Sequence, residues 1–274
     1  MSRIQRRQLA SMAGSRLLWT SVLSALFVVL LGAGQNTPLN SQQAPAGQAA
    51  VNSPLDTPLR LIADARQSYQ RVADYMCQFR KREQLRGQMQ PENVIAMRVR
   101  TKPFSVYLRW QVPGPLAGQE ACYVAGRNNG LLRAHSPGLR GAVGFVSLDP
   151  NDPRCLENSR HAITEAGIGN LIERFGKRWQ VESRLNLTQV RTAQFDYNKR
   201  RCTRVETIHP DNKGNQFSFY RSLVYFDQAT HLPIRVENYD WPRAGGDPNG
   251  ALVESYSYVD LRLNVGLPAS TFEH

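Results

Sequence analysis

The sequence predicts a mainly β, α+β fold in which one large antiparallel sheet carries two helices. Three observations lead to this prediction. Apolar residues recur at helical spacing after Thr57, and from Asn93 onward most apolar runs switch to a period of two. Turn-forming residues separate the alternating runs at short intervals, as in antiparallel strands joined by hairpins.

The first 34 residues have the layout of a secretory signal. Residues 1–16 carry four arginines and no acid, residues 17–31 are apolar, and the small residues Gly32, Ala33 and Gly34 suit cleavage before Gln35. The apolar run is about 15 residues long, short of the roughly 20 that a membrane span needs. We therefore expect export to the periplasm or cell envelope. An uncleaved N-terminal anchor is the alternative, and it would be the protein's membrane contact.

Residues 35–55 are uncharged and rich in Gln, Asn, Ala, Pro and Ser, which predicts a flexible low-complexity leader. Residues 56–274 are then a single domain. Removing the predicted signal lowers the formal net charge from +12 to +8. A basic protein favours an acidic partner. Export argues against nucleic acid, so the expected partners are anionic lipid headgroups or an anionic envelope polymer; a solvated basic surface without a partner is the alternative.

The first predicted helix begins with Thr57 as the N-cap and Pro58 as the first helical residue. One stripe of the helix is apolar and is expected to pack on the sheet. The stripe consists of Leu59, Ile62, Ala65, Tyr69, Val72, Met76 and Phe79.

Two strand meanders are expected on either side of a second helix. Period-two patterns predict the first meander within residues 93–135 and the second from residue 189 to the C-terminal region. The middle helix is expected within residues 158–179. Its buried side would be formed by Ile168, Leu171, Ile172, Phe175 and Trp179.

The hairpin at residues 223–242 has a polar corner from Asp227 to Leu232. On its return strand Ile234 and Val236 share a face, opposite Arg235 and Glu237. The hairpin therefore has one apolar face, which must pack against either the protein's own helices or a bound molecule.

Four cysteines, none in CxxC spacing, argue against a zinc site. An even number in an exported chain suggests disulfides, for which three pairings are open. We favour Cys77–Cys202 with Cys122–Cys155.

The motifs of common enzymes are missing from the sequence. It contains no P-loop, GxGxxG, HExxH or GxSxG pattern, and its five histidines are scattered singly. We predict a non-enzymatic protein without a cofactor or metal; a hydrolase with an unrecognised site is the alternative. Two basic runs, Arg80–Arg82 and Lys199–Arg201, are candidates for an anionic headgroup or for plain solvation.

Three segments carry a resemblance to a known family: residues 102–110 (KPFSVYLRW), 225–242 (YFDQATHLPIRVENYDWP) and 263–272 (LNVGLPASTF). With Cys77 and Cys202, they make the chain similar to an exported bacterial family known as domain of unknown function 1571. The helix and meanders also resemble lipoprotein carriers of the LolA/LppX type. That resemblance implies a curved antiparallel sheet forming an incomplete barrel, plugged by the two helices, whose concave apolar face accepts acyl chains. The family brings no catalytic residue.

The leading functional hypothesis is a lipid, or a lipidated partner such as an acylated protein, bound in a hydrophobic cavity. The alternative is an envelope scaffold or interaction module with a filled core and a basic face that binds acidic polymer. The candidate cavity residues are Met97, Val99, Val106, Leu108, Trp110, Phe219, Leu223, Ile234 and Val236.

Overall fold

A computed structural model describes residues 53–210 and 216–274. The predicted signal (1–34) and all but the last three residues of the predicted leader (35–55) lie outside the described residues. Leu55, the last leader residue, is buried in the core. Among the described residues, no helix is long and apolar enough to cross a membrane.

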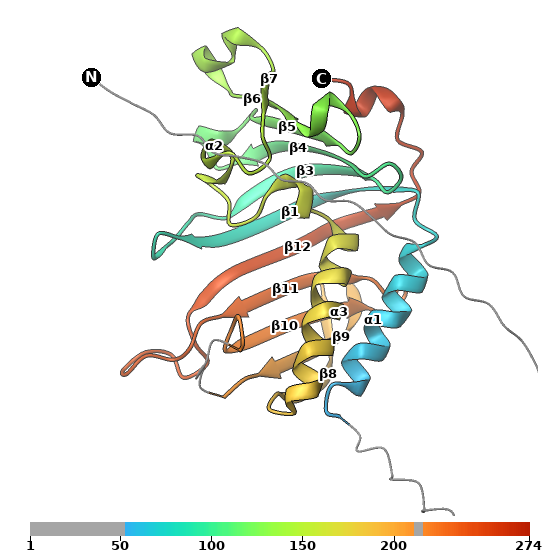
Figure 1. Cartoon of the computed structure of the whole chain (residues 1–274), viewed down its shortest axis with the longest axis vertical. Helices are drawn as coiled ribbons and strands as arrows, with labels where there is room; N and C mark the ends of the chain where they lie inside the picture. The colour runs from blue at the N-terminus through green and yellow to red at the C-terminus, as the bar shows by residue number, and fades with distance from the viewer. Residues whose placement is uncertain (1–52, 211–215) are drawn as a thin grey trace, which may run out of the picture. The chain divides into compact units, whose positions relative to one another are not determined.

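Twelve antiparallel strands form one open sheet in the described part of the chain (Figure 1). Their order is β7-β6-β5-β4-β3-β1-β12-β11-β10-β9-β8, and β2 pairs with β1 at the side of this path. The two expected meanders therefore join where β1, the first strand, pairs with β12, the last. The strands are β1 (Asp74–Leu85), β2 (Gln88–Met89), β3 (Asn93–Arg100), β4 (Ser105–Val112), β5 (Glu120–Val124), β6 (Leu132–His135), β7 (Val146–Leu148), β8 (Gln189–Tyr197), β9 (Arg200–Ile208), β10 (Arg221–Asp227), β11 (Pro233–Tyr239) and β12 (Leu252–Leu263). This confirms the mainly β fold with a curved sheet that does not close.

The first helix is shorter than predicted. α1 spans Asp56–Tyr69, and β1 begins at Asp74. The predicted stripe continued to Phe79 because Val72, Met76 and Phe79 happen to fall at helical spacing. In β1 the buried side is instead set by a period of two, with Tyr75, Cys77 and Phe79 on one face.

The middle helix, α3 (Ile168–Leu185), begins ten residues later than the predicted segment and ends six residues later. The preceding residues form the short helix α2 (Pro153–Leu156) and a strap that runs to Gly167. The expected buried residues of the middle helix are all buried, including Trp179. α1 packs beside α3, and a bidentate ion pair joins Arg66 to Glu173 at 2.8 and 3.0 Å.

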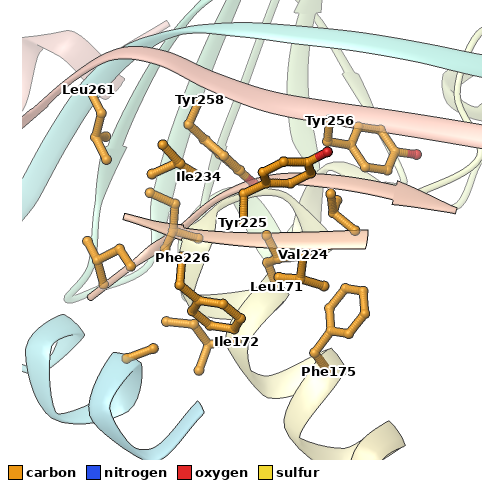
Figure 2. Packing of buried hydrophobic residues seen from close by; sticks show 14 of the residues in the cluster. Leu171, Ile172, Phe175, Val224, Tyr225, Phe226, Ile234, Tyr256, Tyr258 and Leu261 are labelled. Atoms are coloured by element: carbon orange, nitrogen blue, oxygen red, sulfur yellow. The ribbon is translucent and has the colours of Figure 1, made fainter. Parts of the chain in front are cut away.

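The two helices cover the inner face of the β12–β9 half of the sheet (Figure 1). Phe226 on β10 lies 6.4 Å from Trp179 on α3, ring centre to ring centre. Figure 2 shows Leu171, Ile172 and Phe175 of α3 directed toward this half of the sheet. This part of the inner face is therefore filled by the protein's own side chains.

The hairpin of β10 and β11 follows the prediction at its corner and on its return strand, but not at Leu223. Its corner lies between Asp227 and Pro233, and the Asp227 carboxylate accepts hydrogen bonds from the Ala229 N–H and from the Thr230 hydroxyl. Because Val224 pairs with Val236, these two residues share the inner face. Leu223 pairs with Glu237 and therefore faces the outer side.

The predicted disulfides are wrong for this structure, in which all four cysteines are free. Cys77 on β1 and Cys202 on β9 are four strands apart, about 19 Å along the sheet, whereas bridged Cα atoms lie within about 7 Å. Cys122 faces the outer side, where its Sγ lies 3.6 Å from the Phe272 carbonyl. Its neighbour Ala121 faces inward with Cys155, so the sheet separates the second pair.

Candidate functional site

A cavity of about 820 Å³ lies on the inner face of the other half of the sheet, across strands β12, β1 and β3–β7. Neither α1 nor the greater part of α3 reaches this region. The helices therefore cover and fill one half of the inner face of the sheet, and the other half contains the cavity.

The floor of the cavity is apolar because alternate residues of neighbouring strands share a face. Ile95 pairs with Trp110, and Leu108 pairs with Ala121, which in turn pairs with Ala134. Further along, Leu132 pairs with Leu148. All of these residues line the cavity, and Ile95, Leu108 and Leu132 are buried.

The roof consists of α2 and the strap that follows it, up to Gly167, and it carries Cys155, Asn158 and His161 against the cavity. Asp152 begins the short helix α2 by accepting the Arg154 N–H at 2.8 Å. At the other end the Ile168 N–H donates to the Tyr75 hydroxyl at 2.9 Å. Gly167 has φ of +98°, and a Cβ there would meet that hydroxyl, so the turn into α3 requires glycine.

One wall of the cavity is charged. The Lys81 ammonium lies 3.0 Å from the Glu83 carboxylate and donates to the Asn158 carbonyl of the roof at 2.9 Å. Glu83 also accepts the Tyr256 hydroxyl at 2.6 Å and the Arg160 N–H at 3.2 Å. Lys81 and Glu83 are buried, so each charge is compensated by the other.

Glu254 on β12 is the second anchor of the roof. Its carboxylate accepts the Arg160 side chain at 3.0 Å, contacts His161 Nε2 at 3.0 Å and accepts the Asn238 amide at 2.8 Å. His161 Nδ1 lies 3.2 Å from Glu165, which also accepts from Arg174. Both ring nitrogens of His161 thus face carboxylate oxygens.

These contacts fix the protonation of the wall. Burial would raise the pKa of Glu254, but the hydrogen bond and charge of His161, the Asn238 amide and Arg160 together lower it to about 2. Burial and the carboxylates of Glu254 and Glu83 raise the pKa of the Tyr256 hydroxyl well above its ordinary value. At neutral pH the wall therefore presents ionised Glu254 beside a neutral phenol.

Two of the nine predicted cavity residues, Leu108 and Trp110, line the cavity. Five lie on the inner face in the packed core: Met97, Val99, Val106, Ile234 and Val236. Leu223 is buried on the outer side, and Phe219 is half-buried, 5.1 Å from the Arg178 guanidinium. Whether any of them touches a ligand stays a prediction.

Sequence reasoning missed the charged wall. Lys81 was part of a basic run, and Glu254 stood in an unremarkable strand. A signal was present, because the alternation of side chains along β1 and β12 places four polar residues on the inner face: Lys81, Glu83, Glu254 and Tyr256. Ionisable residues at inward strand positions point to a polar site. No group of three or more potential metal ligands gathers within residues 53–210 and 216–274.

Comparison with family models identifies the family of the chain. A family model described as protein of unknown function (DUF1571) matches residues 72–274. No curated protein matches the chain. The family model confirms the family that the sequence motifs predicted.

Solved structures of low identity are similar in fold. Lipoprotein LppX from Mycobacterium tuberculosis is 10% identical, with 77% of this chain and 97% of that chain covered and a TM-score of 0.44. LprF from Mycobacterium bovis is 10% identical, with 79% and 97% covered and a TM-score of 0.42. A LolA superfamily protein from Nitrosomonas europaea is 12% identical, with 78% and 96% covered and a TM-score of 0.31. At these identities and TM-scores the matches carry no ligand, partner or role over to this chain.

Proposed function

Because the chain belongs to the DUF1571 family, for which no function is described, we propose a function from its cavity: it binds a lipid, or the acyl chain of a lipidated partner. The observation that carries the proposal is the hollow half of the inner face. Its volume of about 820 Å³ lies in the range of ligand sites in proteins.

The chemistry of the lining fits an amphiphile. The floor, built from residues such as Ile95, Leu108 and Leu132, offers apolar surface to a hydrocarbon chain. The wall and roof carry polar and charged side chains, including His161 and Arg174, that can face a polar headgroup. A molecule with one apolar and one polar end matches this division.

We further propose that the protein is exported to the cell envelope and is not an enzyme. The basic and apolar N-terminal residues support export. The ionised groups of the cavity support a structural role, because Lys81, Glu83 and Glu254 hold the roof through ion pairs and hydrogen bonds.

Native mass spectrometry of protein purified from its own host tests the proposal. We expect a population whose mass exceeds that of the chain by the mass of a lipid, which organic extraction then releases and identifies. A single bare mass under gentle ionisation, together with no uptake from mixed lipid vesicles, would contradict lipid binding and favour the scaffold hypothesis.

A further inference from the structure

The outer face of the sheet carries an array of arginines that is not visible as a run in the sequence. The first basic run contributes only Arg80 and Arg82 to it, and the second contributes nothing. In the first, Lys81 turns inward to pair with Glu83. In the second, Arg200 pairs with Asp227 at 2.8 Å and Arg201 with Asp196 at 3.1 Å.

The array is built by strand register instead. Directly paired residues across β1, β12, β11, β10 and β9 read Arg80, Ser257, Arg235, Tyr225 and Arg204. Because paired residues share a face, arginines stand on every second strand of this row, about 10 Å apart. A second row crosses β1 at Met76, which pairs with Arg262 of β12 on one side and with Arg98 of β3 on the other.

Much of this charge is uncompensated. Several outer-facing arginines form no ion pair with a carboxylate of residues 53–210 or 216–274, among them Arg82, Arg98, Arg109, Arg191, Arg204 and Arg262. Four of them, Arg82, Arg109, Arg191 and Arg262, are exposed. Several carboxylates near this face already pair with other arginines: Glu92 with Arg80, Glu206 with Arg221 and Glu237 with Arg235. Glu120, which stands opposite Arg109, accepts the Tyr107 hydroxyl.

Aromatic rings hold several of these guanidinium groups in place. Arg204 lies 5.3 Å from the ring centre of Phe195, Arg98 lies 5.5 Å from that of Tyr107, and Arg235 lies 4.7 Å from that of Tyr197. Stacking covers the flat face of a guanidinium and leaves its N–H edge free to donate to an anion.

We propose that this outer face binds a flexible linear polyanion, a polymer that carries phosphate or carboxylate groups at close intervals. The charge of the face and the donor geometry of arginine match such groups. A flexible chain can follow the curvature of the outer face, whereas a flat lipid surface contacts only part of that face. The cavity opens on the opposite, inner face, so the polymer and the cavity ligand bind independently.

The test is binding of fluorescently labelled inorganic polyphosphate to the folded protein, measured by anisotropy at several salt concentrations. The variant removes four exposed arginines of the face: R82Q, R109Q, R191Q and R262Q. The control removes the same charge elsewhere, at exposed arginines of helix, turn and loop: R60Q, R71Q, R127Q and R243Q. Thermal unfolding of both quadruple variants establishes that they are folded.

We expect the wild-type affinity to fall steeply with salt, because binding releases counterions from the polymer. The outer-face variant should bind at least about tenfold more weakly and with a shallower salt dependence, while the control stays within about twofold. A polyuronate in place of polyphosphate distinguishes carboxylate from phosphate polymers.

Three outcomes would overturn the proposal: no binding by the wild type, equal loss in both quadruple variants, or stronger binding to vesicles of anionic phospholipid than to the polymer at equal phosphate concentration. Equal loss in both quadruple variants would show that binding depends only on net charge. Stronger binding to the vesicles would show that the outer face binds a membrane. Since the four substitutions leave the cavity intact, lipid found by native mass spectrometry is unaffected by any of these outcomes.

Discussion

His161 Nε2 lies 3.0 Å from Glu254 Oε2, and this contact ties the roof of the cavity to the strand that joins the two halves of the sheet. The same carboxylate receives Arg160, the preceding roof residue, at 3.0 Å. Glu254 therefore belongs to the buried polar wall and also binds the two roof residues Arg160 and His161. Its ionisation makes the stability of the fold depend on pH.

Replacing Glu254 with Gln should remove an acid dependence of stability. In the folded protein the pKa of Glu254 is lowered from 4.5 to about 2, so the unfolded state binds the proton first as the pH falls. The stabilisation is complete above pH 4.5 and is lost as the pH falls toward 2. A shift of this size corresponds to about 3 kcal/mol, measured by denaturant unfolding across this pH window.

Glu254→Gln should be less stable than the wild type at pH 7, and the gap should narrow on acidification. Exposed Glu273→Gln is the matched control and should track the wild type. If the difference in free energy of unfolding between the wild type and Glu254→Gln stays constant from pH 7 to about 2.5, the roof does not hold the carboxylate of Glu254 ionised.

The four thiols should be free and should differ in reactivity. Cys155 is half-exposed, whereas Cys77, Cys122 and Cys202 are buried. Burial raises the pKa of Cys122 and of Cys202 to about 11, which lowers their thiolate fraction at neutral pH. Labelling with a thiol reagent should therefore modify Cys155 first and the rest only on unfolding. A denatured, unreduced protein with fewer than four reactive thiols would instead show that a disulfide forms.

Local patterns predicted most of the fold. Alternation identified the inner face of β11 but placed Leu223 of β10 on the wrong face. The apolar stripe of α3 identified Trp179 as buried. Both patterns depend on neighbours in sequence. The end of α1 was mispredicted because Val72, Met76 and Phe79 fall at helical spacing, although in β1 Met76 and Phe79 lie on opposite faces of the strand. Only the burial of Tyr75 and Cys77 between them distinguishes the strand from a helix.

Long-range pairing explains what the sequence did not reveal. Glu83 and Glu254 are opposite each other only because β1 pairs with β12, and the arginine row from Arg80 to Arg204 depends on the register of four such pairings. The cavity exists because α1 and most of α3 do not cover its half of the inner face. These strand pairings join residues that are far apart in the sequence, so no local pattern in a single sequence reveals them.

Trp179→Ala should be severely destabilising. The side chain is fully buried, packs against Phe175 at 5.2 Å and Phe226 at 6.4 Å between ring centres, and joins α3 to the sheet. Removing a large buried aromatic side chain costs about 3–5 kcal/mol, which denaturant unfolding measures. Trp241→Ala, at a half-buried site beyond β11, should cost about 1 kcal/mol or less. Equal losses at the two sites would contradict the packing of α3 on the inner face.

Ala121→Trp should abolish ligand uptake while leaving the fold intact. Ala121 lies on the cavity floor between Leu108 and Ala134, so an indole there extends into open space rather than into a packed core. We expect binding of a dansyl-labelled fatty acid to weaken at least about tenfold, because the apolar volume that would hold the chain is occupied.

The same substitution at the exposed Ala193 of β8 is the control, since it adds an indole far from the cavity. Both variants should unfold within a few degrees of the wild type, because the cavity can accept the new ring without overpacking. Unchanged uptake by Ala121→Trp would place the lipid elsewhere and remove the cavity from the proposed function. Loss of uptake together with a large drop in unfolding temperature would show that the cavity is smaller or more tightly packed than its lining indicates.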